Sequence, residues 1–245
     1  MTGRAVANEF AKMRRLRVVP VAVAMVLGVV ALSCQGLTGP DFAEHPWRSL
    51  LASMSLAVSL LSPVLLAVLA SRPVDIEHRG NGWLLSQTSG LSPGELCRAK
   101  CAATGAVVVG ATLLQSGLVG ALGELAGTTA AFPVRQWLGY TAAIVIINLV
   151  LFALHLLLAA RLSNQLVGLG LGVLGLFLTV TGSVLPAWLA HFLPPWGYYA
   201  LVSPVEYRGE NMVWLTPAYP STLALGIAGG AVFLLLTRLF DRQEA

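Results

Sequence analysis

Residues 136–160 read QWLGYTAAIVIINLVLFALHLLLAA and contain no acidic or basic side chain. Arg135 and Arg161 close this stretch at its two ends. An α-helix needs roughly 20 apolar residues to cross the ~30 Å hydrocarbon layer of a membrane. Because lipid offers no hydrogen-bond partners to the backbone, a helix is favoured there over an open strand. The stretch therefore predicts a membrane-spanning helix.

The same pattern recurs along the chain, whose 15 basic and 11 acidic side chains are unevenly distributed. One charge-free run, 162–205, is too long for a single crossing, but Pro186, Pro194 and Pro195 confine its helix to 165–185. The fold class predicted is an all-α polytopic membrane protein with six transmembrane helices. The predicted spans are 18–36, 50–71, 101–123, 137–160, 165–185 and 218–238.

The composition excludes two broad classes. Of the 245 residues, 56% are hydrophobic and 11% are charged, whereas a soluble domain carries about 25% charged residues. Intrinsic disorder needs low hydrophobicity and high charge, which is the opposite balance. The solvent of this protein is therefore lipid.

Orientation follows from lysine and arginine. With the N-terminus inside, the predicted outer segments hold only Arg48, Arg135 and Arg208, so 12 of the 15 basic residues lie inside. This positive-inside bias places both termini in the cytoplasm. The net charge of +4 then reflects topology, and no nucleic-acid partner is predicted. Frequent Ala, Gly, Val and Leu point to a GC-rich bacterium, and hence to the bacterial cytoplasmic membrane.

Two segments outside the spans have a pattern of their own. In 4–17, apolar residues recur at helical spacing among basic ones, which predicts an interfacial helix; an ordinary basic flank is the alternative. Residues 186–217 are rich in proline and aromatic residues, and Ser203-Pro204-Val205-Glu206 has the form of a capping box. We expect an outer re-entrant segment there, with two short helices, one of them starting at Ser203.

The cytoplasmic segment 72–100 is predicted to be a compact helical loop. Gly80, Asn81 and Gly82 make a turn. Ser92-Pro93-Gly94-Glu95 is a capping box, so a helix starts at Ser92 and leads into the third span. A loop of this kind suits docking to a cytoplasmic protein, and a plain connecting loop is the alternative.

Several kinds of chemistry find no support in the sequence. No acidic residue lies inside a predicted span, which argues against an ion-coupled carrier. There is no Walker A pattern, nucleophile elbow or H-E-x-x-H motif, so no enzyme activity is predicted. Cys97 and Cys101 have no further ligand nearby, so no metal site is predicted. Asn148 and His155 lie on one face of the fourth span, either as inter-helix hydrogen-bonding groups or as liners of a substrate path.

The whole arrangement resembles the permease subunit of type-2 ABC exporters. The most specific local match is the stretch from Glu77 through His78, Arg79, Gly80, Asn81 and Gly82 to Trp83, followed by Leu91-Ser92-Pro93 and Lys100. It is closest to the small permeases linked to lantibiotic immunity and antimicrobial-peptide export. The architecture covers the entire chain, and the local motif covers about 25 residues.

The resemblance implies partners and roles. Two copies of a separate ATPase subunit would use ATP and Mg²⁺, while this chain would bind no cofactor. It would pair with a second permease copy or a paralogous permease in the lipid bilayer. The residues implied in coupling to the ATPase are Glu77, His78, Arg79, Gly82 and Trp83. Those implied in lining a substrate path are Ser55, Ser59 and Phe177, which would make Asn148 and His155 structural.

The function predicted is ATP-driven export of an amphipathic substrate: an antimicrobial peptide, a drug or a lipid-like compound. The alternative is a non-transporting membrane scaffold or sensor that docks a cytoplasmic protein. A third reading is an intramembrane enzyme with an unrecognised site. The helical loop 72–100 disfavours the enzyme, and the outer segment 186–217 favours the exporter over the scaffold, which has no need of it.

Overall fold

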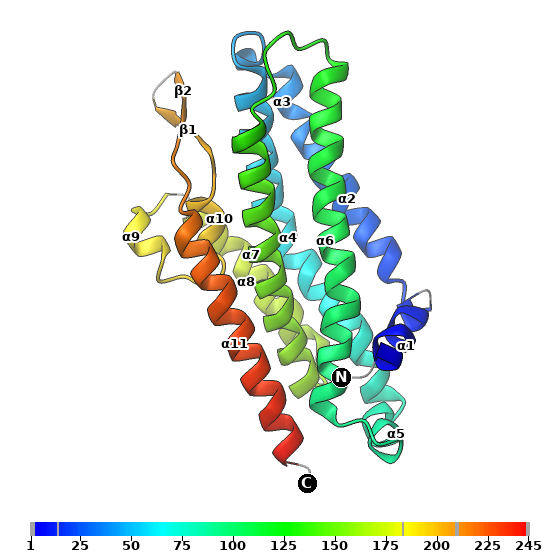
Figure 1. The fold of residues 1–245 in the computed structure, drawn as a ribbon. Coiled ribbons are helices and arrows are strands. Elements are labelled where there is room, and N and C mark those ends of the chain that lie inside the picture. Colours follow the sequence, from blue (N-terminus) through cyan, green and yellow to red (C-terminus); the bar gives the residue numbers. More distant parts are fainter. Residues whose placement is uncertain (1–2, 14, 183, 209–210, 244–245) are drawn as a thin grey trace.

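The structure, a computed structural model, describes residues 3–13, 15–182, 184–208 and 211–243, and it is built mainly from long helices (Figure 1). Within these residues, six helical segments are long and apolar enough to cross a membrane, which confirms the predicted fold class. They are α2 with α3 (Val18–Ser33 and Gln35–Thr38), α4 (Pro46–Arg79), α6 (Pro93–Leu125), α7 (Val134–Arg161), α8 (Gln165–Gly182) and α11 (Tyr219–Gln243).

Shorter elements lie at the two ends of the bundle. Figure 1 places both chain termini, α1 (Gly3–Met13) and α5 (Gly82–Thr88) at one end, which we call the termini end. The other end, the hairpin end, carries the antiparallel strands β1 (Val205–Arg208) and β2 (Asn211–Trp214). The 3₁₀ turn η1 (Pro40–Phe42) precedes α4, and α9 (Ala187–Ala190) and α10 (Tyr198–Leu201) follow α8.

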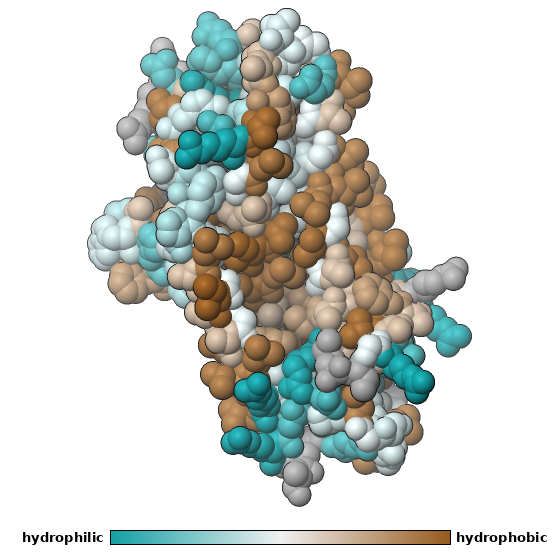
Figure 2. Space-filling view, in the orientation of Figure 1, coloured by the Kyte–Doolittle hydropathy of each residue, from teal (hydrophilic) through white to brown (hydrophobic). Residues whose placement is uncertain are grey.

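A belt of apolar side chains surrounds the bundle. Figure 2 shows hydrophobic residues across the middle of this face and hydrophilic residues gathered at both ends. Large apolar side chains such as Leu27, Phe177 and Ile227 are mostly exposed. Exposed apolar area on this scale is costly in water and natural in lipid. The chain is therefore a multi-pass membrane protein.

Helix α4 occupies the centre, in contact with α2, α7 and α8. It runs from Pro46 to Arg79 through two internal prolines, Pro63 and Pro73, and is thus longer than the predicted span 50–71. Helix α6 begins at Pro93, ahead of the predicted span 101–123, as the capping box at Ser92 predicted. Segment 72–100 is consequently the last turns of α4, then α5, then the first turns of α6. Charged residues mark where an apolar span ends, and a helix can continue past that point.

The N-terminal helix ends sooner than the predicted 4–17 segment. Helix α1 stops at Met13, Arg14 lies outside the described residues, and Arg17 has a left-handed backbone (φ 55°) just before α2. Ala5, Glu9 and Met13 are its buried residues, so one face of α1 packs on the bundle, chiefly on α6.

One predicted helix is wrong. No helix starts at Ser203, which lies two residues before β1, and its hydroxyl donates to the carbonyl oxygen of Val205 at 3.0 Å. Strand β1 then pairs with β2, with Val205 opposite Trp214. The β-branched and aromatic residues of 205–214 favour a strand, and no helical apolar run follows Ser203. The short helices of this segment are α9 and α10, which precede Ser203.

Candidate functional site

At the termini end, four charged side chains from three helices form one cluster, in which Lys12 is partly exposed and the other three are buried. Lys100 of α6 donates to Glu77 Oε1 of α4 at 2.6 Å and to Glu9 Oε2 of α1 at 2.8 Å. Lys12 of α1 donates to Glu9 Oε1 at 2.7 Å and to Glu77 Oε1 at 3.0 Å. We call Glu9, Lys12, Glu77 and Lys100 the ion cluster. It ties α1, α4 and α6 together.

The ion cluster is electrically balanced, with two carboxylates and two ammonium groups. Lys100 is 0% exposed, Glu9 3% and Glu77 4%. Buried charges of this kind persist only when they are paired and hydrogen-bonded. Burial alone would lower the pKa of Lys12. The carboxylates of Glu9 and Glu77 raise the pKa by more than burial lowers it, so it lies above the ordinary value. Lys12 therefore stays charged at neutral pH.

Helix α5 is built directly against this cluster. The chain turns at Asn81, whose backbone is left-handed (φ 49°). A Cβ atom at Gly82 would overlap the Glu77 carboxylate, so any other residue there would have to displace that carboxylate. Trp83 lies 6.0 Å from the ring of His78, and His78 Nε2 donates to the carbonyl oxygen of Ala159 in α7 at 2.9 Å. Tight backbone packing and the two aromatic rings therefore hold α5 to α4, and the His78 hydrogen bond joins α4 to α7.

The outer face of α5 is apolar and uncovered. Leu84 is 62% exposed and Leu85 is 63% exposed, and Figure 1 shows α5 at the extreme of the termini end. Thr88 and Ser89 beside them are also exposed. These two adjacent leucines are the apolar side chains that α5 leaves open to contact by another molecule.

Some residues predicted for coupling are buried and hold α5 in place, and others are exposed at the surface. Glu77 is buried in the ion cluster, and Gly82, which has no side chain, packs on it, so both support α5 and offer no side chain to a partner. Arg79 is exposed and pairs with Asp75 at 2.8 Å. The residues predicted for coupling did not include Leu84 and Leu85, the two exposed leucines of α5.

The other members of the ion cluster were also missed, apart from Lys100, which stood in the family motif. Glu9 had a detectable signal, because it is the only acidic residue before Asp41 and lies among basic residues. Its position on the same helix face as Ala5 and Met13 could have marked it as buried.

The start of α6 is held by a second set of contacts. Ser92 Oγ accepts from the backbone N–H of Glu95 at 3.3 Å, which confirms the predicted helix cap. The N–H of Gly94 donates to Asp241 Oδ1 of α11 at 2.8 Å, and Arg98 pairs with the same carboxylate at 3.1 Å. These contacts fasten the end of α11 to α6.

A large cavity lies toward the hairpin end. It measures about 860 Å³, is partly open, and is lined by α4, α8, the segment from α9 to β1 and the connection from β2 to α11. Ser55 and Ser59 of α4 line it together with Thr179 of α8 and Tyr199 of α10. Phe177 does not line it and is 64% exposed on the outer surface of α8. The structure therefore brings together two of the three residues predicted to line a substrate path.

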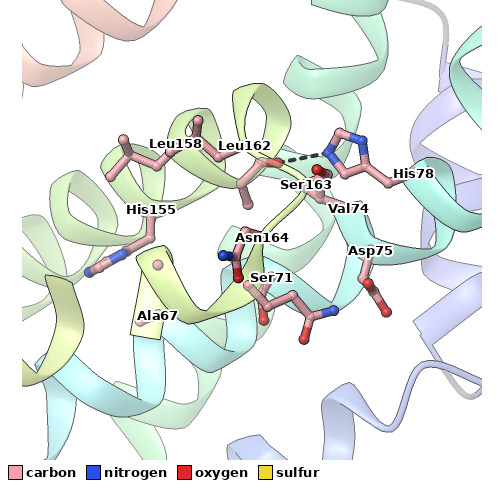
Figure 3. A pocket seen from close by; sticks show the side chains of 13 residues that line it. Ala67, Ser71, Val74, Asp75, His78, His155, Leu158, Leu162, Ser163 and Asn164 are labelled. Carbon is pink, nitrogen blue, oxygen red and sulfur yellow. Dashed lines mark hydrogen bonds between the residues drawn. The ribbon is translucent and has the colours of Figure 1, made fainter. Parts of the chain in front are cut away.

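Two polar residues of α7 have different environments. Asn148 donates to Thr112 Oγ1 at 3.0 Å and accepts from Tyr199 Oη at 2.7 Å, so it joins α6, α7 and α10 as an inter-helix hydrogen-bonding group. His155 is buried, and neither ring nitrogen has a hydrogen-bond partner among the described residues. It lines a pocket of about 20 Å³, room for one water molecule, with Ser71 and Asn164 also in its wall (Figure 3).

These features define a class: a polytopic helical membrane protein with a braced, partner-accessible helix at one end and a cavity toward the other. The family model described as ABC-2 family transporter protein matches residues 5–182. The chain therefore belongs to this family. No curated protein matches the chain. The family's membrane subunits are typically non-catalytic, and they work with an ABC ATPase.

The family match includes the whole ion cluster and α5, and it ends at the last residue of α8. The segment from α9 to α11 lies beyond it. The ion cluster and α5 thus lie wholly within the match, whereas the cavity is walled on one side by residues outside it.

Proposed function

We propose that this chain is the permease subunit of an ATP-driven exporter that moves an amphipathic compound out of a bacterial cell. The resemblance to permeases of lantibiotic immunity makes an antimicrobial peptide the first candidate, ahead of a drug or a lipid-like compound. The observation that carries the proposal is the placement of α5. Its Gly82 packs on the ion cluster, and its Leu84 and Leu85 are exposed.

In this proposal, α5 docks on the ATPase and transmits its motion. Gly82 touches the Glu77 carboxylate without an intervening side chain, so displacement of α5 acts directly on α4. Lys100 and Lys12 pass the same displacement to α6 and α1. At 1.5 Å per residue, the 34 residues of α4 extend about 50 Å, long enough to link this joint with the cavity at the other end.

The cavity supplies the substrate path. Ser55, Ser59 and Thr179 offer hydroxyl groups, and Leu56 and Val180 offer apolar contacts. A mixed lining of this kind suits a compound with both polar and apolar parts. Phe177 faces away from the cavity, so it would contribute only where a second permease chain packs against α8.

The proposed complex contains two permease chains and two ATPase subunits, which bind the ATP and Mg²⁺. The chain spans the bacterial inner membrane. Its termini end faces the cytoplasm, and its hairpin end faces the outside of the cell. The excess of lysine and arginine in the segments at the termini end supports this orientation.

The test is a pair of substitutions on α5. Leu84→Asp with Leu85→Asp should reduce co-purification of the co-expressed ABC ATPase at least about tenfold, because two charges would replace the apolar contact. The control is Leu125→Asp, a largely exposed leucine at the other end of α6. Equal recovery of the ATPase with both variants would show that α5 is not the docking helix.

A further inference from the structure

A basic groove lies at the termini end beside the ion cluster. It measures about 440 Å³ and runs between the connection from α1 to α2 and the last turns of α4. Arginines stand on both walls, with Arg15 and Arg17 on one side and Arg72 and Arg79 on the other. Asp75 is the one acidic residue among those that line it.

The groove has an excess of positive charge. Arg79 is paired with Asp75 through contacts of 2.8 and 3.0 Å, so these two charges cancel. Arg15, Arg17 and Arg72 are exposed, and none of them has an ion pair or side-chain hydrogen bond within the described part of the chain. Three uncompensated guanidinium groups around one concave surface form a site for an anion, and their planar forks fit phosphate oxygens.

An exposed apolar stripe follows the groove residues along the chain. On α2, Val19, Val23 and Leu27 are exposed at intervals of four residues, so they form one stripe that starts two residues beyond Arg17. On α4, Ile76 is exposed among the lining residues. A cationic mouth followed by an exposed apolar stripe matches a molecule with an anionic head and hydrocarbon tails.

We propose that this groove binds the phosphate head group of an anionic phospholipid, with its acyl chains along the stripe of α2. Basic pockets at the cytoplasmic ends of transmembrane helices are suited to such head groups. The bound lipid would join the α1–α2 connection to α4. On α4 it would contact the groove at Arg79, two residues from Glu77. The lipid composition of the membrane would then set how firmly the ion cluster is held, and with it the coupling through α5.

The experiment uses the purified full chain in detergent, without an ATPase, so that its result does not depend on the proposed export function. Phosphatidylglycerol, phosphatidylcholine and inorganic phosphate are titrated separately, and lipid retention is measured by native mass spectrometry. The test variant is Arg17→Gln with Arg72→Gln. The control, Arg4→Gln with Arg238→Gln, removes the same charge from exposed positions outside the groove.

We expect the wild type to retain phosphatidylglycerol and not phosphatidylcholine. The groove variant should need about thirtyfold more phosphatidylglycerol for half-saturation, and the control should stay within about threefold of wild type. Equal weakening in both variants would mean diffuse attraction to the basic surface, and no weakening would mean no site. Both results would overturn the proposal.

The phosphate titration and one further measurement test other occupants. If inorganic phosphate displaces phosphatidylglycerol at equal concentration, the groove is a free-phosphate site and the lipid assignment is wrong. If the groove variant keeps its lipid but loses the co-expressed ATPase, the arginines belong to a protein contact. Unchanged ATPase recovery with weakened lipid retention supports the assignment.

Discussion

The two ends of α4 carry different kinds of polar side chain in different surroundings. At the termini end, Glu77 is a full charge in a closed network with Glu9, Lys12 and Lys100. Toward the hairpin end, Ser55 and Ser59 are neutral and face a cavity of about 860 Å³. One helix thus connects a tight cluster of charged side chains with a partly open cavity lined by neutral ones.

The difference bears on how each end can respond to force. Separating a buried ion pair leaves uncompensated charges, which costs several kcal/mol. Losing one neutral inter-helix hydrogen bond in a membrane protein costs much less, about 0.6 kcal/mol on average. The termini end is therefore suited to transmit displacement without yielding, and the cavity end is suited to rearrange around a substrate.

The largest effect is expected from breaking the ionic contact. Lys100→Met leaves Glu9 and Glu77 buried with Lys12 alone, so one negative charge stays uncompensated. We expect a destabilisation of about 3–5 kcal/mol. The measurement is unfolding of the purified protein in detergent, followed by heat and by denaturant.

The matched control for that substitution is Arg79→Met. Its ion pair with Asp75 is the exposed counterpart on the same helix, since the Arg79 side chain is 75% exposed. Exposed pairs contribute about 0–1 kcal/mol. If Lys100→Met proved no more harmful than Arg79→Met, the ion cluster would not be the joint between α1, α4 and α6.

A smaller effect is expected from adding one methyl group at each end. A Cβ atom at Gly82 would overlap the Glu77 carboxylate, whereas at Gly182 it would lie 3.3 Å from Gly197 Cα. Gly82→Ala should therefore cost about 1–3 kcal/mol of stability by overpacking, and Gly182→Ala should cost less. The reverse order, measured by thermal unfolding, would contradict the view that the termini end is the tighter one.

Sequence alone was sufficient for the spans and insufficient for the contacts between them. The charge-free runs predicted six crossings because lipid excludes charge, whatever the neighbouring helices are. Partners within the ion cluster could not be predicted, since Glu9 and Lys100 are far apart in sequence and meet only after α1 folds onto α6. The cavity at Ser55 and Ser59 likewise could not be predicted, because it depends on how the segment from α8 to β1 packs against α4.

Two similar motifs show where local reasoning fails. Ser92-Pro93-Gly94-Glu95 and Ser203-Pro204-Val205-Glu206 have the same capping pattern. The first starts the 33 residues of α6, because an apolar run follows and Gly94 leaves room for Asp241. The second opens a hairpin that is fixed to α4 through Arg48, which donates to the carbonyl oxygen of Met212 at 2.8 Å. The residues after a cap and their tertiary partners decide its outcome.

The smallest stability effect, and the most selective functional one, is expected at Tyr199. Tyr199→Phe removes the hydroxyl that donates to Asn148 at 2.7 Å, one neutral hydrogen bond between α10 and α7. We expect a loss of stability of about 1 kcal/mol or less.

Tyr199 also forms part of the cavity wall, so the same change should alter substrate-stimulated ATPase activity of the complex more than it alters unfolding. Thr112→Val is the matched control, since it breaks the other hydrogen bond of Asn148, at a residue that does not line the cavity. If both variants changed stimulation equally, the effect would come from Asn148, and the cavity would lose its assignment as the adaptable end. A change confined to Tyr199→Phe would place substrate recognition at the neutral end of α4, opposite the ionic joint.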